Sequence, residues 1–399
     1  MKRFNGIALS VAFCSLASQA ALAQTKIDTL KVQHLNEVIV KGVRAAKEAP
    51  YAVANIRKSE LKQFSCSGQE LPFLLSRTPG ILAWSENGIG TGTTYMRIRG
   101  AAGSRINVTL DGVALNSPED QTVFWANMNS YSSLLGSIQV QRGVGSSTNG
   151  DGAFGGSISM ATAAPSLTPT AEVTGSFGSY NTYHTGASFS TGLLGKHLIF
   201  DGAYHETATD GYVDGTAGRS GSYYGGLTWL GDNFKISYKN IGNFEKTGQA
   251  WNGVLGGDYN SSFTLLDDGI RTYKDMYKAG LDKFNVLTGD LVRNDKGDYT
   301  ITPYTLRDGS KWDKTTDNFY QNHNILSATW TPGSHWSHSL SLHYTYGYGY
   351  YKEFKNNAKF AKFGLIYKDA EGNKIKKSDF IRKKGLTQHT YGMVYNTNY

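Results

Sequence analysis

The second half of this sequence is a succession of segments in which polar and apolar side chains alternate. In one of them, Phe200 and Tyr204 share one parity, whereas Asp201 and His205 share the other. Successive side chains of a β-strand point to opposite faces, so this period of two predicts strands with one apolar and one polar face. Eight such segments follow Pro169, at residues 172–177, 183–189, 198–204, 223–230, 234–241, 324–330, 340–351 and 390–399. We therefore predict an antiparallel sheet over most of this half.

The connections between these segments alternate between short and long. Residues 230–233 leave room only for a tight turn, whereas residues 243–314 form a long connection. The chain contains 47 Gly, 25 Tyr and 18 Phe, and its mean hydropathy is −0.38. In an exported chain these features are typical of a transmembrane β-barrel, in which lipid-facing and lumen-facing residues alternate. On composition alone, a soluble all-β protein is the alternative.

The first 23 residues have the three parts of a secretory signal peptide. Lys2 and Arg3 precede an apolar run at residues 7–17, and Ala21-Leu22-Ala23 provides a small-residue cleavage site. A membrane anchor is the alternative, but the run is shorter than the roughly 20 residues that span a bilayer. The mature chain would keep one cysteine, Cys66, and therefore no internal disulfide.

The formal charge of +8 falls to +6 once the two basic residues of the signal peptide are removed (8 − 2). This surplus is spread along the sequence, and an exported protein rarely meets nucleic acid, so we expect no nucleic acid partner. Basic loops would instead favour an anionic ligand or anionic lipid headgroups.

Residues 56–164 mix helical and strand signals and are predicted to form a small α+β domain. Ser59 is a candidate helix cap, and a second helix through Leu71 and Leu75 should stop at Thr78-Pro79-Gly80. Short strands are expected at residues 95–100, 106–110, 137–142 and 156–160, with a turn at Asp111-Gly112.

Residues 150–155 satisfy the pattern G-x-G-x-x-G. A dinucleotide-binding fingerprint needs a helix that opens at its last glycine, whereas a strand-like segment follows here. We expect these glycines to allow tight turns and close backbone packing instead.

Several motifs occur in the order found in TonB-dependent outer-membrane receptors, and the chain resembles this family, in particular its Bacteroides-type members. The resemblance extends from about Leu35 to the end. The motifs are Glu37-Val38-Ile39-Val40, Leu75-Ser76-Arg77-Thr78-Pro79-Gly80-Ile81, Met96-Arg97-Ile98-Arg99-Gly100, Asn107-Val108-Thr109-Leu110-Asp111-Gly112-Val113 and the run from Ser137 to Thr162.

The resemblance implies an α+β plug domain followed by an antiparallel transmembrane β-barrel in the outer membrane of a Gram-negative cell. The implied divisions are a signal peptide (1–23), a periplasmic tether (24–55), the plug (56–164) and a partial barrel (165–399). The family barrel has about 22 strands, so the eight to ten segments counted here indicate a truncated receptor or one piece of a split gene.

The implied activity is active import of a large, scarce ligand. Glu37, Val38, Ile39 and Val40 would pair with the inner-membrane protein TonB by adding a strand to its sheet, and tension on this strand would displace the plug. The alternative is that this strand pairs within the plug. Ferric siderophores are the first expectation for the cargo, with haem, cobalamin or glycans as others. A passive porin or adhesin is the competing class.

Further residues are singled out by position within the family motifs. Arg97, Arg99 and Arg142 are expected to hold the plug against acidic residues of the barrel wall, or else to face lumen water. The candidate ligand contacts are Trp84, Phe124, Trp125 and Trp251, although Phe124 and Trp125 could simply pack against the wall. No pattern of a catalytic, metal or cofactor site rises above chance, so we do not expect an enzyme.

Overall fold

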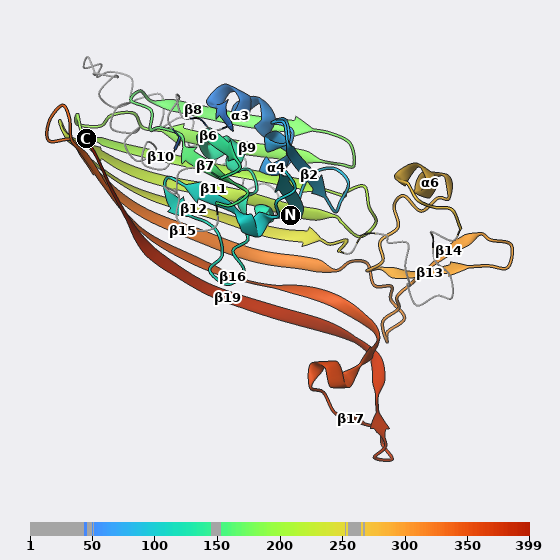
Figure 1. Ribbon diagram of the computed structural model, residues 1–399. Helices are drawn as coiled ribbons and strands as arrows, with labels where there is room; N and C mark the ends of the chain where they lie inside the picture. Colours follow the sequence, from blue (N-terminus) through green and yellow to red (C-terminus); the bar gives the residue numbers. More distant parts are fainter. Residues whose placement is uncertain are drawn as a thin grey trace, which may run out of the picture.

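The computed structural model describes residues 44–45, 50, 52–144, 153–251, 253, 265 and 268–399. It consists of a small α+β domain that lies against one face of a large curved sheet (Figure 1). We refer to the small domain as the plug, to the sheet face that contacts it as the inner face, and to the opposite face as the outer face. No helix in the described ranges is long and apolar enough to cross a membrane.

The large sheet has eight antiparallel strands in the order β19-β16-β15-β12-β11-β10-β9-β8. All eight alternating segments predicted from the sequence are strands of this sheet. Several extend further than predicted, because their ends carry polar residues that obscure the alternation. The strands are β8 (Thr170–Phe177), β9 (Tyr183–Ser190), β10 (Leu198–Thr209), β11 (Gly218–Leu230), β12 (Phe234–Gly248), β15 (Thr316–Trp330), β16 (Ser337–Lys359) and β19 (Lys377–Asn398).

Short turns lie at one end of this sheet and long loops at the other, as predicted. The turn between β11 and β12 is closed by a hydrogen bond from Gly231 N to Phe234 O of 2.8 Å. The long loops project from the opposite end (Figure 1). The elements of these loops are α6 (Tyr273–Lys278), β13 (Gly289–Arg293), β14 (Tyr299–Pro303), η3 (Phe360–Phe363), β17 (Tyr367–Lys368) and β18 (Lys374–Ile375).

The plug contains a five-stranded sheet in the order β1-β6-β7-β4-β5 and a separate hairpin, β2-β3. Its strands are β1 (Ala52–Arg57), β2 (Ile81–Ser85), β3 (Thr94–Ile98), β4 (Ile106–Leu110), β5 (Val113–Ala114), β6 (Leu135–Arg142) and β7 (Gly156–Thr162). Its helices are α3 (Lys58–Ser65), α4 (Leu71–Leu75), η1 (Gly103–Arg105), η2 (Trp125–Met128) and α5 (Tyr131–Leu134). The predicted α+β domain is confirmed, although strand β1 was not anticipated.

The first plug helix begins two residues earlier than the predicted cap allows. The cap is Arg57 rather than Ser59, because Arg57 has an extended backbone (φ −93°, ψ 164°) that continues β1. The side chain of Glu60 accepts a hydrogen bond of 3.3 Å from Arg57 N. A carboxylate at the third helical position therefore satisfies the backbone N–H of the cap residue, as the glutamate of a capping box does.

Gly155, the last glycine of the G-x-G-x-x-G pattern, packs closely against the plug, as predicted. A Cβ on Gly155 would lie 2.4 Å from Ala101 Cβ, so no larger residue fits at this position. A strand follows it, which is the order that argued against a nucleotide site. Gly150 and Gly152 lie outside the described residues.

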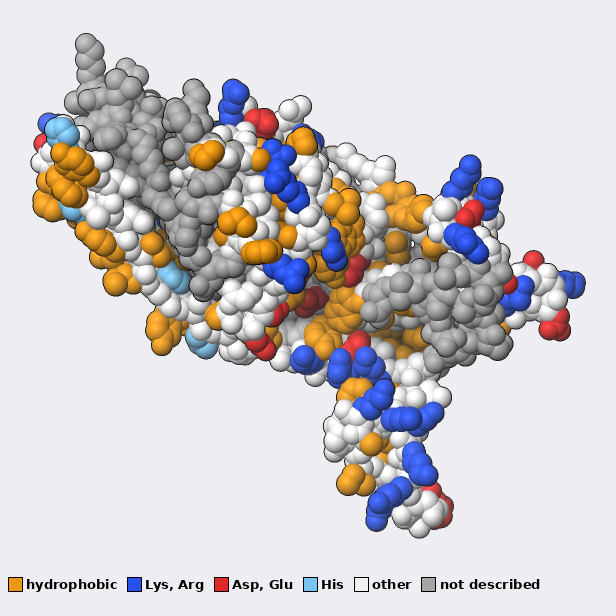
Figure 2. All heavy atoms as spheres, viewed as in Figure 1, with side chains coloured by type: hydrophobic (Ala, Val, Ile, Leu, Met, Phe, Trp, Pro, Cys, Tyr) orange, Lys and Arg blue, Asp and Glu red, His pale blue; other side chains and the backbone are white. Residues whose placement is uncertain are grey.

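The two parts bury different kinds of side chain. One apolar cluster fills the plug, with Leu75, Ile98 and Ile158 fully buried. Ile241 of β12 extends this cluster into the large sheet, which we also call the wall. The inner face of the sheet is polar where the plug covers it. Large apolar side chains of the strands point outward, and Figure 2 shows them along the outer side of the sheet. They include Phe200, Tyr204, Leu227, Trp229, Ile236, Tyr238, Leu326, Leu342 and Tyr344.

Candidate functional site

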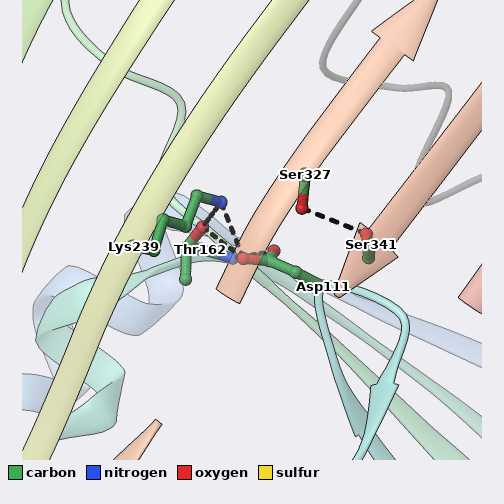
Figure 3. Close-up of polar contacts among 5 residues, drawn as sticks. All are labelled: Asp111, Thr162, Lys239, Ser327 and Ser341. Atoms are coloured by element: carbon green, nitrogen blue, oxygen red, sulfur yellow. Dashed lines mark hydrogen bonds and ion pairs between the residues drawn. The ribbon is translucent and has the colours of Figure 1, made fainter. Parts of the chain in front are cut away.

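A buried ion pair joins the plug to the sheet. Asp111 lies in the turn between β4 and β5, and Lys239 lies on the inner face of β12. Lys239 Nζ is 2.7 Å from Asp111 Oδ2, and it also donates to Thr162 Oγ1 at 2.5 Å. Thr162 N and Thr162 Oγ1 donate to the two carboxylate oxygens, each at 2.9 Å. Figure 3 shows the three side chains converging between the plug and the wall.

The Asp111 carboxylate is held in its charged form. Burial alone would raise the pKa of this carboxyl, but the Lys239 ammonium and the donors of Thr162 outweigh burial and lower it. Asp111 has φ +50° and is followed by Gly112 at φ +82°. Aspartate tolerates this left-handed conformation better than most residues, so the turn and the ion pair depend on the same side chain.

The sequence predicted the Asp111-Gly112 turn but not the ion pair. The expected polarity was the reverse, with plug arginines facing acids of the wall. Arg142 instead donates 2.7 Å to Pro79 O, and Arg97 donates 3.3 Å to Gly100 O. Both acceptors are backbone atoms of the plug. Arg99 has φ +48° just beyond β3, so it does not continue the strand parity of Arg97. A wall contact of these three arginines stays a prediction.

The segment behind the predicted TonB-binding strand is fastened to the plug sheet. Glu37, Val38, Ile39 and Val40 themselves lie outside the described residues. Arg44 donates to the carbonyl oxygens of Ser159, at 2.9 Å, and Ser137, at 3.2 Å. It also donates to the hydroxyl oxygens of the same two serines, at 3.3 and 3.0 Å. One guanidinium thus holds β6 and β7 together.

Two further hydrogen bonds extend this attachment. Ala45 N donates 2.8 Å to Gln139 Oε1, and Gln139 Nε2 donates 3.3 Å to Ala45 O. Burial lowers the pKa of Arg44 to about 10, and the negative charge of Asp111 opposes that shift. The guanidinium therefore remains charged at neutral pH. We refer to Arg44, Ala45, Ser137, Gln139 and Ser159 as the tether clasp.

The plug presents one loop, residues 86–93, to the long loops of the sheet. Glu86 Oε1 accepts 2.6 Å from Tyr95 OH, and Glu86 Oε2 accepts 3.1 Å from Ala250 N. Burial raises the pKa of Glu86. Thr93 Oγ1 donates 2.7 Å to Gln249 Oε1. The plug loop is thereby connected to the segment that contains Trp251.

The four predicted ligand-contact aromatics have different environments. Trp84 stacks on Tyr95 with ring centroids 5.4 Å apart and is 39% exposed, and Phe124 is 59% exposed. Trp125 is only 5% exposed and belongs to the plug core. This burial favours packing over a ligand contact for Trp125, because a buried ring has no free face for a ligand. Trp251 packs edge-on against Tyr351, with 5.1 Å between centroids.

Cationic side chains surround Tyr351 on the inner face of the sheet. Arg382 donates 2.8 Å to Tyr351 OH, and its guanidinium carbon lies 5.4 Å from the centre of the Tyr351 ring. Lys384 Nζ lies 5.8 Å from the same ring. Arg382 also pairs with the buried carboxylate of Glu353. This group was not singled out in the sequence, because its members lie in separate segments and meet only through strand register.

A cavity of about 420 Å³ lies beside this group. It runs along a row of cross-strand neighbours, Glu245, Phe319, Gly349 and Leu386, which the register places side by side. Such a volume is within the usual range for a small-molecule site. A Cβ on Gly349 would lie 2.3 Å from Asn318 O, so the recess requires glycine there.

Comparison with known proteins agrees with this architecture. Residues 45–157 match the TonB-dependent Receptor Plug Domain. A search of curated proteins found no match to the chain.

Among solved structures, the fold is similar to the ferric-catecholate import receptor Fiu from E. coli K12. The closed form has a TM-score of 0.59 at 12% identity over 89% of this chain and 45% of that chain. The open form has a TM-score of 0.57 at 12% identity over 87% and 46%.

The ferric yersiniabactin uptake receptor FyuA from Yersinia pestis has a TM-score of 0.54 at 12% identity, over 89% of this chain and 52% of that chain. At these identities the likeness concerns the fold, and the chain spans about half the length of the structures it matches. Residues 45–157 therefore form a TonB-dependent receptor plug domain, and the curved antiparallel sheet that follows it has a fold similar to that of those receptors.

Proposed function

We propose that this protein takes part in the active import of a large ligand across the outer membrane, driven by TonB. The observation that carries the proposal is the tether clasp. It attaches the residues just behind Glu37–Val40 to β6 and β7, so a pull on that strand would be delivered to the middle of the plug sheet.

The tether clasp determines the order in which the hydrogen bonds of the plug would break under tension. The contacts of the clasp are side-chain hydrogen bonds. Strand β1, which follows it in the sequence, pairs with β6 along its whole length, from Ala52↔Arg142 to Arg57↔Ser137. Tension would first release Arg44 and then act on β1, whose backbone bonds can open one at a time. Local opening is easiest where few apolar contacts resist it, and β1 has only Ile56 in the apolar core.

The proposed cargo is a ferric siderophore. The aromatic and cationic side chains around Tyr351 suit an anionic ligand with flat groups, because cations and rings provide charge and stacking together. The solved structures similar to this chain include receptors for ferric catecholates and ferric yersiniabactin. Haem, which is flat and anionic, is the next candidate. Cobalamin or a neutral glycan would make less use of the cations.

The proposal is tested by deleting Glu37–Val40 and measuring uptake of a ferric catecholate in iron-starved cells. The matched control deletes residues 29–32, which shortens the tether by the same length and leaves the strand intact. We expect uptake to be lost only in the first deletion, with normal amounts of both proteins in the outer membrane. Unchanged uptake after the first deletion would favour the competing class, a passive porin or an adhesin, which needs no such strand.

Cargo identity needs a separate test. Growth of cells with and without the gene is compared on a ferric catecholate, a ferric hydroxamate and haem as the only iron source. We expect a defect on a siderophore. A defect on haem alone would replace the siderophore assignment but leave TonB-dependent import in place.

A further inference from the structure

The outer face of β16 carries a band of leucine and tyrosine side chains that is interrupted by a lysine. Beyond that lysine, Phe354 packs against Tyr304 and Trp312 of the long loop. Every second residue from Leu340 to Tyr350 is leucine or tyrosine, and the next residue on this face is Lys352. Ten residues of a strand tilted by about 45° rise about 24 Å, which is close to the roughly 25 Å height of the apolar band in outer-membrane proteins. Lys352 therefore stands at the level of lipid headgroups, on the side of the long loops.

A second lysine lies directly opposite it. In the ladder between β16 and β19, Lys352 is the cross-strand partner of Lys383. Like charges directly opposite each other destabilise a sheet unless a counter-ion separates them. The next cross-strand pair, on the inner face, is Glu353 and Arg382, whose opposite charges form an ion pair. None of the ion pairs found among the described residues includes Lys352 or Lys383.

Aromatic rings hold both ammonium groups at this level. Lys383 Nζ lies 3.6 Å from the centre of the Tyr350 ring, and Lys352 Nζ lies 5.3 Å from that of Trp312, which comes from the long loop. Ring contacts of this kind stabilise a cation while leaving its N–H donors free for an anion. Both lysine side chains are exposed. Figure 2 shows further basic side chains on the neighbouring loop that projects from the sheet.

We propose that Lys352 and Lys383 bind the phosphate of an anionic glycolipid headgroup in the outer leaflet. A phosphate between two facing lysines would relieve their repulsion, and the apolar band directly below would accept the acyl chains. Phosphate held at the membrane surface is the anion whose position fits, because both lysines lie at the end of that band. This inference rests on the outer-membrane location given under Proposed function, but it does not depend on TonB or on the cargo.

The test measures binding of bisphosphorylated lipid A to the purified full chain in detergent micelles by native mass spectrometry. The variant Lys352→Gln/Lys383→Gln is compared with Lys368→Gln/Lys374→Gln. The second pair is a matched control, because Lys368 and Lys374 also face each other across a ladder, between β17 and β18, but in the projecting hairpin. We expect at least about tenfold weaker binding in the first variant and less than about twofold change in the control.

Two further arms identify the source of the phosphate and guard against misfolding. Dephosphorylated lipid A should bind wild type and variant equally, and Lys352→Arg/Lys383→Arg should restore binding of the phosphorylated lipid. Equal binding of the phosphorylated lipid by wild type and the first variant would overturn the proposal, as would an equal loss in the control pair. Inorganic phosphate that displaces the lipid at equal concentration would also overturn it, by showing a general anion site.

Discussion

The plug buries apolar side chains at its centre, whereas the eight-stranded sheet buries polar ones against the plug. Ile98, Leu110 and Ile158 fill the plug core, while Ser222, Asn243 and His323 of the wall are buried on the inner face of the sheet. A polar interface can exchange its partners for water when it opens, but an apolar core cannot. The difference explains how a plug could leave its wall and still keep its own fold.

Two ion pairs that join the plug to the sheet differ in their exposure to solvent. Lys239 and Asp111 pair in a buried site, with side chains 13% and 6% exposed. Lys62 of α3 and Glu172 of β8 pair at 2.8 Å in an exposed one, at 64% and 45%. Only the first pair is shielded from water and salt, so we expect it to account for most of the electrostatic attachment of the plug.

The largest expected effect is that of Asp111→Asn, which keeps the shape of the turn but leaves Lys239 buried without its counter-charge. We expect the plug to lose about 3–5 kcal/mol of stability. The measurement is urea unfolding of the mature chain in micelles, followed by a fluorophore on exposed Cys66. A loss below about 1 kcal/mol would mean that the wall does not hold the plug through this pair.

A second effect is a pH dependence from Glu70, which is buried in the plug. Burial raises the pKa of its carboxyl to about 8, against hydrogen bonds from Asn129 and Gly92 that lower it. The folded plug therefore binds a proton that the unfolded chain releases above about pH 4.5, so stability should fall as pH rises between these values.

From pH 6 to pH 8 the loss should be about 2 kcal/mol, measured by the same urea titration. Glu70→Gln, which is neutral at every pH, should remove the slope over this range. A slope that persists in this variant would assign the dependence to another group.

An effect of about the same size is expected for Arg44→Ala, which removes the centre of the tether clasp. Loss of several hydrogen bonds to a charged group should cost about 2 kcal/mol and expose residues 44–45 to protease at lower urea concentration. Arg44→Lys retains the charge but not the fork of donors, so we expect it to restore only part of the attachment. An unchanged free energy of unfolding in Arg44→Ala would show that the tether clasp does not stabilise the plug.

The smallest effect is expected for Lys62→Ala. Its ion pair with Glu172 is exposed to solvent, so we expect no measurable change in the urea midpoint of the plug at physiological salt. A shift as large as that of Asp111→Asn would contradict the contrast between buried and exposed attachment.

Much of the fold could be predicted because strands and helices leave local patterns. All eight strands of the sheet were found from alternation, which depends only on neighbours in sequence. Strand β1 was missed because its alternation is weak: Ile56 shares its face with only the small residues Ala52 and Ala54. The candidate site was less predictable. From the sequence, Trp125 could equally have been a ligand contact or a residue that packs against the barrel wall.

The sequence by itself determined which residues alternate, where the chain turns and which segments have the order of a TonB-dependent receptor. Only the tertiary structure decided that Lys239 meets Asp111, that Arg44 spans β6 and β7, and that Lys352 faces Lys383. The physical reason is that periodicity arises from bonds along the chain, whereas each of these contacts joins residues far apart in the sequence. Strand register sets Lys352 opposite Lys383, and the packing of the plug on the sheet brings Asp111 to Lys239.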